Sequence, residues 1–322
     1  MEYPPTDSKR CRVVSSAARP TIATLRKRGA KSTMFSSFNA RAVGLTGLSA
    51  EETVELAAGA GFDGVDLLVR DIVRSGSDPK AIRARMDELG LKGGAFPCPI
   101  DWRGDEASFR LDFAELGPVL DAASVLGLST TGTWVMPECP ALVTDRVEVA
   151  ALHVRRVGTL ARLLDAHGIR LGLEVIGVES FRTCQREPFV ARLGDLEKEL
   201  GAIWAEAPNL GILLDVFHLH AADEPIEAGL RWGISRVCWV HIADLPPEGP
   251  LERSKIIDAN RGLPGENGAV DVGGFLARLA REGYEGPVTA EPMANCRSLA
   301  GLSPRAVAYR VKQSLDLVWP RT

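Results

Sequence analysis

The sequence predicts an α/β protein whose main domain is a single closed barrel of eight parallel strands, each followed by a helix, (β/α)₈. Its 322 residues are enough for such a barrel, which typically needs about 250. From residue 34 onward, short apolar runs alternate with helical patterns eight times, which favours one parallel barrel. No glycine-rich dinucleotide or phosphate loop follows any of these runs, so we expect no nucleotide cofactor.

In the first half, start and stop signals delimit the helices. Ser49 and Glu52 have the spacing of a capping box, and Gly90 follows the second helix as a stop signal. The expected strands are Met34–Phe38, Val65–Val69, Lys92–Phe96 and Ser129–Met136. The expected helices run from Ser49 to about Gly59, over Pro79–Leu89, within Phe109–Leu126 and over Asp145–His167.

In the second half, the strand-like runs are almost entirely apolar, as strands buried in a parallel sheet are. The expected strands are Arg170–Val175, Leu210–Val216, Arg236–Ile242 and Pro287–Glu291. The expected helices lie around Pro188–Ala205, Ile226–Trp232, Val272–Glu282 and Pro304–Val318. Two connections, 97–107 and 243–269, are longer than usual and leave the C-terminal ends of strands. A barrel keeps its chemistry at these ends, so we expect both loops to cover a substrate.

The composition argues against several classes of protein. The net charge is −4, which gives no support for nucleic-acid binding. No apolar run approaches the roughly 20 residues that a membrane span requires. The six cysteines are scattered, without a Cys-x-x-Cys pair, which favours a reduced, cytoplasmic chain. Residues 1–33 contain eight Lys and Arg and are predicted to be a basic, flexible extension of the barrel domain 34–322.

Four potential metal ligands stand near the ends of strands five to eight: Glu174, Asp215, His241 and Glu291. Because the C-terminal ends of all strands open onto one face of a barrel, these side chains could converge. Three carboxylates and one imidazole suit Mn²⁺ or Mg²⁺, with Co²⁺ or Zn²⁺ as alternatives. A single strand-end carboxylate is more often a helix cap or loop anchor. The set of four nevertheless predicts one divalent-metal site.

Five stretches of the second half resemble the sugar phosphate isomerase/epimerase superfamily, the xylose isomerase-like TIM barrels, which include ketose 3-epimerases and inosose dehydratase and isomerase. They are GLEVIG at 172–177, LDVFH at 214–218, VHIAD at 240–244, RGLPGE at 261–266 and GYEGPVTAEP at 283–292. In the first half, AGFDGVD at 60–66 is similar to the family's second strand and its lead-in.

This resemblance implies that Glu174, Asp215, His241 and Glu291 bind one divalent ion, with Mn²⁺ as the first expectation. It also implies that Glu174 and Glu291 form an acid/base pair that moves protons at a substrate carbon through a metal-stabilised enediolate.

Four further residues are candidates for substrate binding. The resemblance places a substrate-contacting histidine at His218; a supporting or loop-packing role is the alternative. Arg261 could bind hydroxyls, a carboxylate or a phosphate; the alternative is a salt bridge that orders its loop, with Glu266 as the suggested partner. Trp134 and Trp102 could form flat walls for a sugar or an aromatic ring, although tryptophans more often pack in the core.

The resemblance implies an isomerase or epimerase of a sugar, keto-sugar or cyclitol. A lyase or dehydratase that eliminates from a 3-keto-sugar, similar to C-glycoside deglycosidases or inosose dehydratase, stays open. Ketose epimerases usually carry an arginine six residues after the metal-binding histidine, where this chain has Pro247. The expected partner is a small carbohydrate, and a homo-oligomer or an accessory subunit is possible by analogy.

Overall fold

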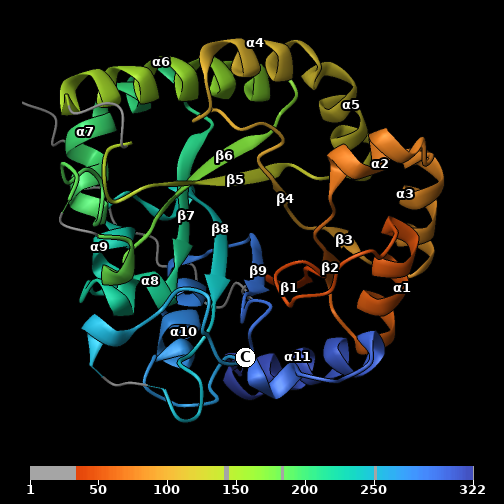
Figure 1. Cartoon of the computed structure of the whole chain (residues 1–322). Helices are drawn as coiled ribbons and strands as arrows, with labels where there is room; N and C mark the ends of the chain where they lie inside the picture. Colours follow the sequence, from red (N-terminus) through yellow and green to blue (C-terminus); the bar gives the residue numbers. More distant parts are fainter. Residues whose placement is uncertain (1–33, 141–144, 183–184, 250–251, 322) are drawn as a thin grey trace, which may run out of the picture. The chain divides into compact units, whose positions relative to one another are not determined.

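The computed structural model describes residues 34–140, 145–182, 185–249 and 252–321. The predicted basic extension, 1–33, lies outside these ranges. The described residues form one parallel sheet in the order β3-β2-β1-β9-β8-β7-β6-β5-β4 (Figure 1). The strands are β1 Phe35–Phe38, β2 Gly64–Val65, β3 Lys92–Gly93, β4 Phe96–Pro97, β5 Thr130–Val135, β6 Arg170–Val175, β7 Leu210–Asp215, β8 Val237–Ile242 and β9 Pro287–Ala290.

The two end strands of this sheet, β3 and β4, are pieces of a single strand. β3 pairs with β2 and β4 pairs with β5, so the sheet closes into a ring of eight strands, as the sequence predicts. The interruption lies where the Asp66 side chain enters the barrel: its Oδ1 accepts a hydrogen bond of 2.8 Å from the Ala95 backbone N–H. Gly94 is required beside it, because a Cβ there would lie 2.1 Å from Asp66 Oδ1.

Helices surround the ring of strands (Figure 1). They are α1 Ala50–Ala60, α2 Val69–Ser75, α3 Pro79–Glu88, α4 Glu106–Ala114, α5 Leu116–Leu126, α6 Arg146–Asp165, α7 Leu193–Glu206, α8 Val216–Ala221, α9 Ile226–Leu230, α10 Val272–Glu282 and α11 Pro304–Val318, with single turns η1 Glu179–Phe181, η2 Ile234–Arg236, η3 Arg253–Lys255 and η4 Arg297–Leu299. The expected capping box is present at the start of α1, where Ser49 Oγ accepts from Glu52 N and Glu52 Oε2 accepts from Ser49 N.

Three elements differ from the prediction. The second strand, expected over Val65–Val69, ends at Val65, and α2 begins at Val69. Leu67 and Val69 are buried although they lie outside a strand, so their apolar side chains suggested a longer strand in the sequence. The helix expected within 109–126 is two helices that meet at Glu115. The sequence analysis also missed α8, which starts directly after β7 because Asp215 Oδ1 caps it by accepting from Phe217 N.

A small apolar core fills the barrel interior. Ala95, Leu213 and Trp239 form this cluster, separate from the large core that includes the packed helices. Gly132 makes room for it, because a Cβ there would lie 2.7 Å from Leu213 Cδ1 and 2.9 Å from Trp239 Cε3. In the described ranges, no helix has the length and apolarity needed to cross a bilayer.

Candidate metal centre

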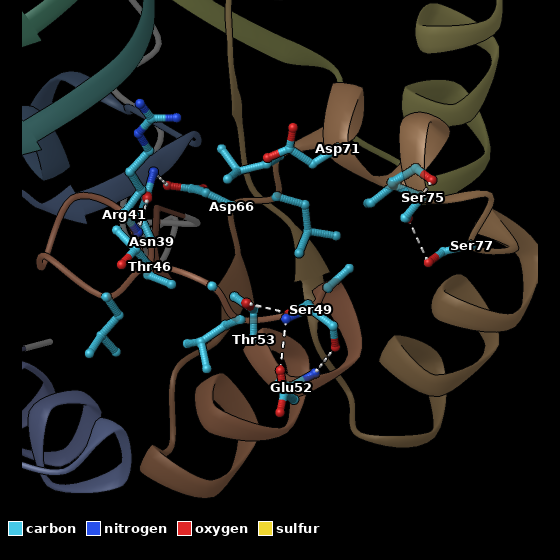
Figure 2. A pocket seen from close by; sticks show the side chains of 18 residues that line it. Asn39, Arg41, Thr46, Ser49, Glu52, Thr53, Asp66, Asp71, Ser75 and Ser77 are labelled. Atoms are coloured by element: carbon cyan, nitrogen blue, oxygen red, sulfur yellow. Dashed lines mark hydrogen bonds between the residues drawn. The ribbon is translucent and has the colours of Figure 1, made fainter.

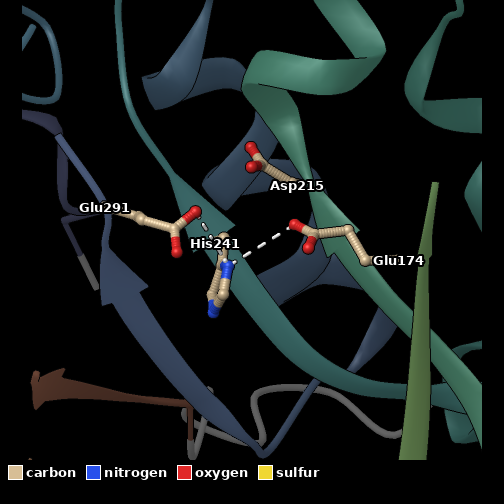
Figure 3. Close-up of side chains that lie close together, drawn as sticks. All are labelled: Glu174, Asp215, His241 and Glu291. Carbon is tan, nitrogen blue, oxygen red and sulfur yellow. Dashed lines mark ion pairs between the residues drawn. The ribbon is translucent and has the colours of Figure 1, made fainter. Parts of the chain in front are cut away.

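The structure brings the four predicted metal ligands together. Glu174 lies near the end of β6, Asp215 at the end of β7, His241 in β8 and Glu291 directly after β9. One potential ligand atom from each lies within 4.8 Å of the others, and the side chains point toward one another (Figure 3). Asp215 and His241 are partners in the register of β7 and β8. The strand-end argument from the sequence therefore identified a real cluster; ligation itself stays a prediction.

The cluster contains polar atoms whose hydrogen-bonding capacity is not used. His241 Nδ1 lies 3.2 Å from Glu291 Oε2 and 3.6 Å from Glu174 Oε1. Within the described part of the chain, neither ring nitrogen of His241 has a hydrogen-bond partner, and Glu174 Oε1 has none either. Buried polar atoms of this kind are costly unless a ligand satisfies them. These three atoms, together with the three carboxylates and one imidazole of the cluster, therefore fit a divalent cation.

The electrostatics of the cluster separate its two glutamates. Burial raises the pKa of Glu174, and the nearby His241 only partly opposes this rise. For Glu291, burial acts in the same direction, but the charges of His241 and Arg261 outweigh it and lower the pKa to about 2. Burial would lower the pKa of His241, yet Glu291 and Glu174 hold it well above the usual value. One glutamate therefore holds a proton more readily than the other.

Arg261 reaches the cluster from the long loop after β8. It is 1% exposed, and its Nη1 donates to Asp215 Oδ2 at 2.8 Å and to Glu291 Oε2 at 3.0 Å. Its Nη2 donates to Asp258 Oδ1 at 2.5 Å. The suggested salt bridge to Glu266 is wrong: Glu266 instead accepts from Leu263 N and Ser298 Oγ. An arginine is thus present at the cluster although Pro247 stands at the family position.

His218 supports this arginine. Its Nε2 lies 3.1 Å from Arg261 Nη2, and its Nδ1 accepts from Gly177 N at 3.3 Å. Gly177 must be a glycine, because a Cβ there would lie 2.1 Å from the His218 carbonyl oxygen. His218 is therefore a buried neighbour of the cluster, and its contact with substrate stays a prediction.

The two candidate tryptophans occupy different environments. Trp134 pairs in register with Glu174 and is 45% exposed, with the Arg103 guanidinium 4.1 Å from its ring centroid. Trp102 has no exposed surface, and its Nε1 donates to Thr133 Oγ1 at 3.0 Å. Trp134 is accessible to a ligand beside Glu174, whereas Trp102 packs in the wall. The sequence analysis gave no role to Arg103, which also donates to Thr133 Oγ1 and the Trp134 carbonyl.

A buried hydrogen-bonded network leads from Asp66 to the cluster. Asp66 accepts from Ser37 Oγ at 2.5 Å and from Thr289 Oγ1 at 2.7 Å. Thr289 Oγ1 in turn accepts from Trp239 Nε1 at 2.9 Å, and the Trp239 ring centroid lies 4.4 Å from that of His241, edge to face. The sequence analysis missed this network, although Thr289 and Trp239 stand two residues before Glu291 and His241 and so share their face of the strands.

A cavity of about 600 Å³ adjoins Asp66 at the ends of β1 and β2. Polar residues line it, among them Asn39, Arg41, Thr46, Asp71, Ser75 and Ser77 (Figure 2). None of these six residues is among the substrate-binding candidates named from the sequence, because the segments that follow two different strands form the cavity together.

The comparison with protein families decides the identity of this barrel. A model of the xylose isomerase-like TIM barrel family matches residues 54–311. The chain belongs to this family. Among solved structures, a xylose isomerase domain protein from Alicyclobacillus acidocaldarius superimposes with a TM-score of 0.76 at 25% identity, covering 88% of this chain and 98% of that one. The IolI protein, solved with a zinc atom, superimposes with a TM-score of 0.71 at 18% identity, covering 89% and 98%.

Curated relatives within this xylose isomerase-like family are enzymes. A 3-dehydroshikimate dehydratase from Pseudomonas aeruginosa is 26% identical over 246 residues, which are 74% of this chain and 35% of that protein. An inosose isomerase from Halalkalibacterium halodurans is 24% identical over 192 residues, 58% of this chain and 61% of that one. The chain spans about a third of the dehydratase. The family is enzymatic, and this chain is an enzyme of it.

Proposed function

We propose that the chain is a divalent-metal-dependent isomerase or epimerase of a sugar, keto-sugar or cyclitol. The observation that carries this proposal is the buried cluster of three carboxylates and one imidazole at the C-terminal mouth of the barrel, with atoms on His241 and Glu174 that form no hydrogen bond among the described residues. In a barrel of this kind, the active site lies at that mouth.

Glu174, Asp215, His241 and Glu291 would hold the ion, for which Mn²⁺ is our first choice because the set is rich in oxygen. When bound, a divalent ion polarises the carbonyl oxygen of a substrate and so acidifies the neighbouring C–H group. Arg261, fixed by Asp215 and Glu291, sets the direction of both carboxylates; because it is buried, it would contact a substrate oxygen only after rearrangement.

Glu174 and Glu291 are the proposed acid/base pair. They approach His241 from two different strands (Figure 3), so a substrate carbon held between them would expose one face to each carboxylate. One glutamate would remove a proton from the carbon beside the carbonyl. The other would return a proton to the opposite face of that carbon, which gives the epimer, or to the former carbonyl carbon while the hydroxyl proton moves to the former carbonyl oxygen, which gives the isomer. Trp134 beside Glu174 would support the sugar ring; Trp102 and His218 would contact it only after rearrangement, because both are buried.

A dehydratase or lyase is the second candidate, and one observation favours it. The relatives that align over the longest stretch, 246 and 245 residues, are dehydratases. Dehydration begins with the same proton removal, but the acid then protonates a hydroxyl that leaves from the next carbon. The two reactions therefore share Glu174, Glu291 and the ion, and they differ in the product.

The first experiment measures bound metal. Full-length protein purified without chelator is analysed for Mn, Mg, Co and Zn, beside the Glu174→Gln, Asp215→Asn double variant. Glu179→Gln serves as the control, because Glu179 is an exposed glutamate on the loop directly after β6. We expect about one ion per chain in the wild type and the control, and loss of the ion in the double variant. Equal metal content in all three proteins, or none after reconstitution, would exclude the proposed centre.

The second experiment tests proton removal directly. The metal-loaded protein is incubated in D₂O with free ketoses, an inosose and 3-dehydroshikimate, and NMR follows deuterium at the carbon beside the carbonyl. Rearranged, deuterated sugar supports the isomerase, and a dehydrated product supports the dehydratase. If the metal-loaded protein exchanges no substrate proton at all, the acid/base roles of Glu174 and Glu291 are wrong.

A further inference from the structure

The cavity at the ends of β1 and β2 is lined by a cationic side chain that has no hydrogen-bond or ion-pair partner among the described residues. Arg41 is exposed and lines this cavity. In the described ranges its guanidinium makes no hydrogen bond or ion pair; only its backbone is bonded, the N–H to Asn39 Oδ1 and the carbonyl to Gly44 N. Two arginines close to the cluster, by contrast, are occupied: Arg261 by three carboxylates, and Arg103 by Thr133, Trp134 and a weaker contact with Asp101.

The acidic residues of the cavity do not neutralise Arg41. Glu52 Oε2 accepts from Ser49 N in the capping box, and Asp66 is bonded by Ser37 and Thr289. Asp71, in the first turn of α2, forms no ion pair with Arg41 among the described residues. In Figure 2 the Arg41 side chain points away from Ser75 and Ser77, which lie across the cavity from it. Its five N–H donors therefore remain available to a ligand.

The backbone that carries Arg41 is held in place next to the metal cluster. Asn39 Oδ1 also accepts from Ala42 N at 3.0 Å, and Met293 N donates to the Ala42 carbonyl at 2.9 Å. Met293 stands two residues after Glu291 and has a left-handed φ of 65°, a conformation that non-glycine residues adopt only under constraint. The loop of Arg41 is thus tied directly to the loop that carries a predicted metal ligand.

We infer that Arg41 and the cavity beside it bind a carboxylate of the substrate, whose ring lies over the metal cluster. This inference rests on the proposed function and names its substrate class: a polyhydroxylated keto ring that bears a carboxylate. A lone guanidinium fork matches one planar carboxylate through two parallel N–H···O bonds. A phosphate dianion is a poorer match, because three carboxylates line the same cavity and no second cation does.

The test compares two ligands that differ only in the carboxylate group. Binding of 3-dehydroshikimate and of its neutral carboxamide to the metal-loaded full chain is measured by calorimetry, for the wild type, Arg41→Gln and Arg281→Gln. Arg281 is the matched control: it is exposed and lies in the last turn of α10, at the N-terminal ends of the strands, away from the mouth. Inorganic phosphate is added as a competitor in a separate series.

We expect the wild type and Arg281→Gln to prefer the carboxylate over the carboxamide, and Arg41→Gln to bind the carboxylate about 10- to 100-fold more weakly. The carboxamide should bind the wild type and Arg41→Gln equally. The inference is overturned if Arg41→Gln weakens both ligands alike or neither, if the metal-loaded wild type binds no carboxylated ring, or if phosphate alone competes at this site. Metal content is measured on the same samples, so failure of the metal centre is seen separately.

Discussion

Two buried carboxylates at the mouth of this barrel, Asp66 and Glu174, differ in the hydrogen bonds that their oxygens accept. Asp66 is 4% exposed and accepts hydrogen bonds from Ser37, Thr289 and the Ala95 backbone. Glu174 is 8% exposed, but its Oε1 has no hydrogen-bond partner in the described part of the chain. Both sit at the end of a strand in a ring of parallel strands, and both carry raised pKa values because of burial.

This difference distinguishes a carboxylate that stabilises the fold from one that is expected to bind a ligand. A buried carboxylate with all its bonds made contributes to the free energy of unfolding, whereas each unpaired buried polar atom costs about 1–3 kcal/mol. A folded protein keeps such a cost mainly where a ligand later removes it. By this criterion we predict that the Asp66 network is structural and that the Glu174–His241 cluster binds a ligand. Each part of this contrast can be tested.

The largest expected effect is on stability. Asp66→Ala leaves the Ala95 N–H and the Thr289 hydroxyl without their acceptor, so we expect the free energy of unfolding to fall by about 4 kcal/mol. Glu174→Ala, in chelator, should change it by less than about 1 kcal/mol, because no hydrogen bond to Oε1 is lost. Urea denaturation of both variants measures this. Similar losses in the two variants would remove the contrast.

Added metal should make Glu174 important for the free energy of unfolding. With the ion in about 100-fold excess over its dissociation constant, we expect the wild type to gain about 3 kcal/mol of stability, because the ion satisfies His241 and Glu174. Glu174→Ala should lose this gain. Thermal melting with Mn²⁺ and after chelation measures it for both proteins. A variant that still gains as much as the wild type would show that Glu174 is not a ligand.

A buried histidine outside the cluster provides a pH test. Burial is the main cause that lowers the pKa of His153 to about 4, despite its Nδ1–H bond to the Val149 carbonyl. Since the unfolded chain has a histidine pKa of about 6.5, it takes up the proton first. Stability is therefore complete above about pH 6.5 and decreases as the pH falls toward 4, by about 2 kcal/mol at pH 5. His153→Phe should lack this part of the acid sensitivity in urea titrations from pH 7 to 5; an unchanged slope would contradict it.

The smallest expected effect concerns the hydrogen bonds of Thr289, which connect Asp66 to Trp239 beside His241. Thr289→Val removes the hydroxyl that donates to Asp66 and accepts from Trp239, so we expect a loss of about 1 kcal/mol and metal binding weakened by up to about tenfold through Trp239 and His241. Thr289→Ser keeps the hydroxyl and should restore both. If the serine variant binds metal as weakly as the valine variant, the hydroxyl does not position His241.

The sequence predicted the barrel and all four members of the cluster, because each member ends an apolar run and parallel strands end on one face. It could not predict that Arg261 bonds to Asp215 and Glu291, since the loop between them has no periodic pattern. The Asp66 network was also out of reach. Its members, Ser37, Asp66 and Thr289, come from β1, the end of β2 and β9, and only the closure of the ring brings them together.

The lengths of the strands have a consequence for how this enzyme can evolve. The strands β5 to β8 have six residues each and pair with one another over four to six positions, whereas β2, β3 and β4 have two residues each. Three of the four members of the cluster belong to the long strands, whereas the cavity with Arg41 lies at the ends of β1, which has four residues, and β2. Substitutions around the cavity leave the long ladders intact, so selection can alter the cavity while the cluster of Glu174, Asp215 and His241 is inherited unchanged.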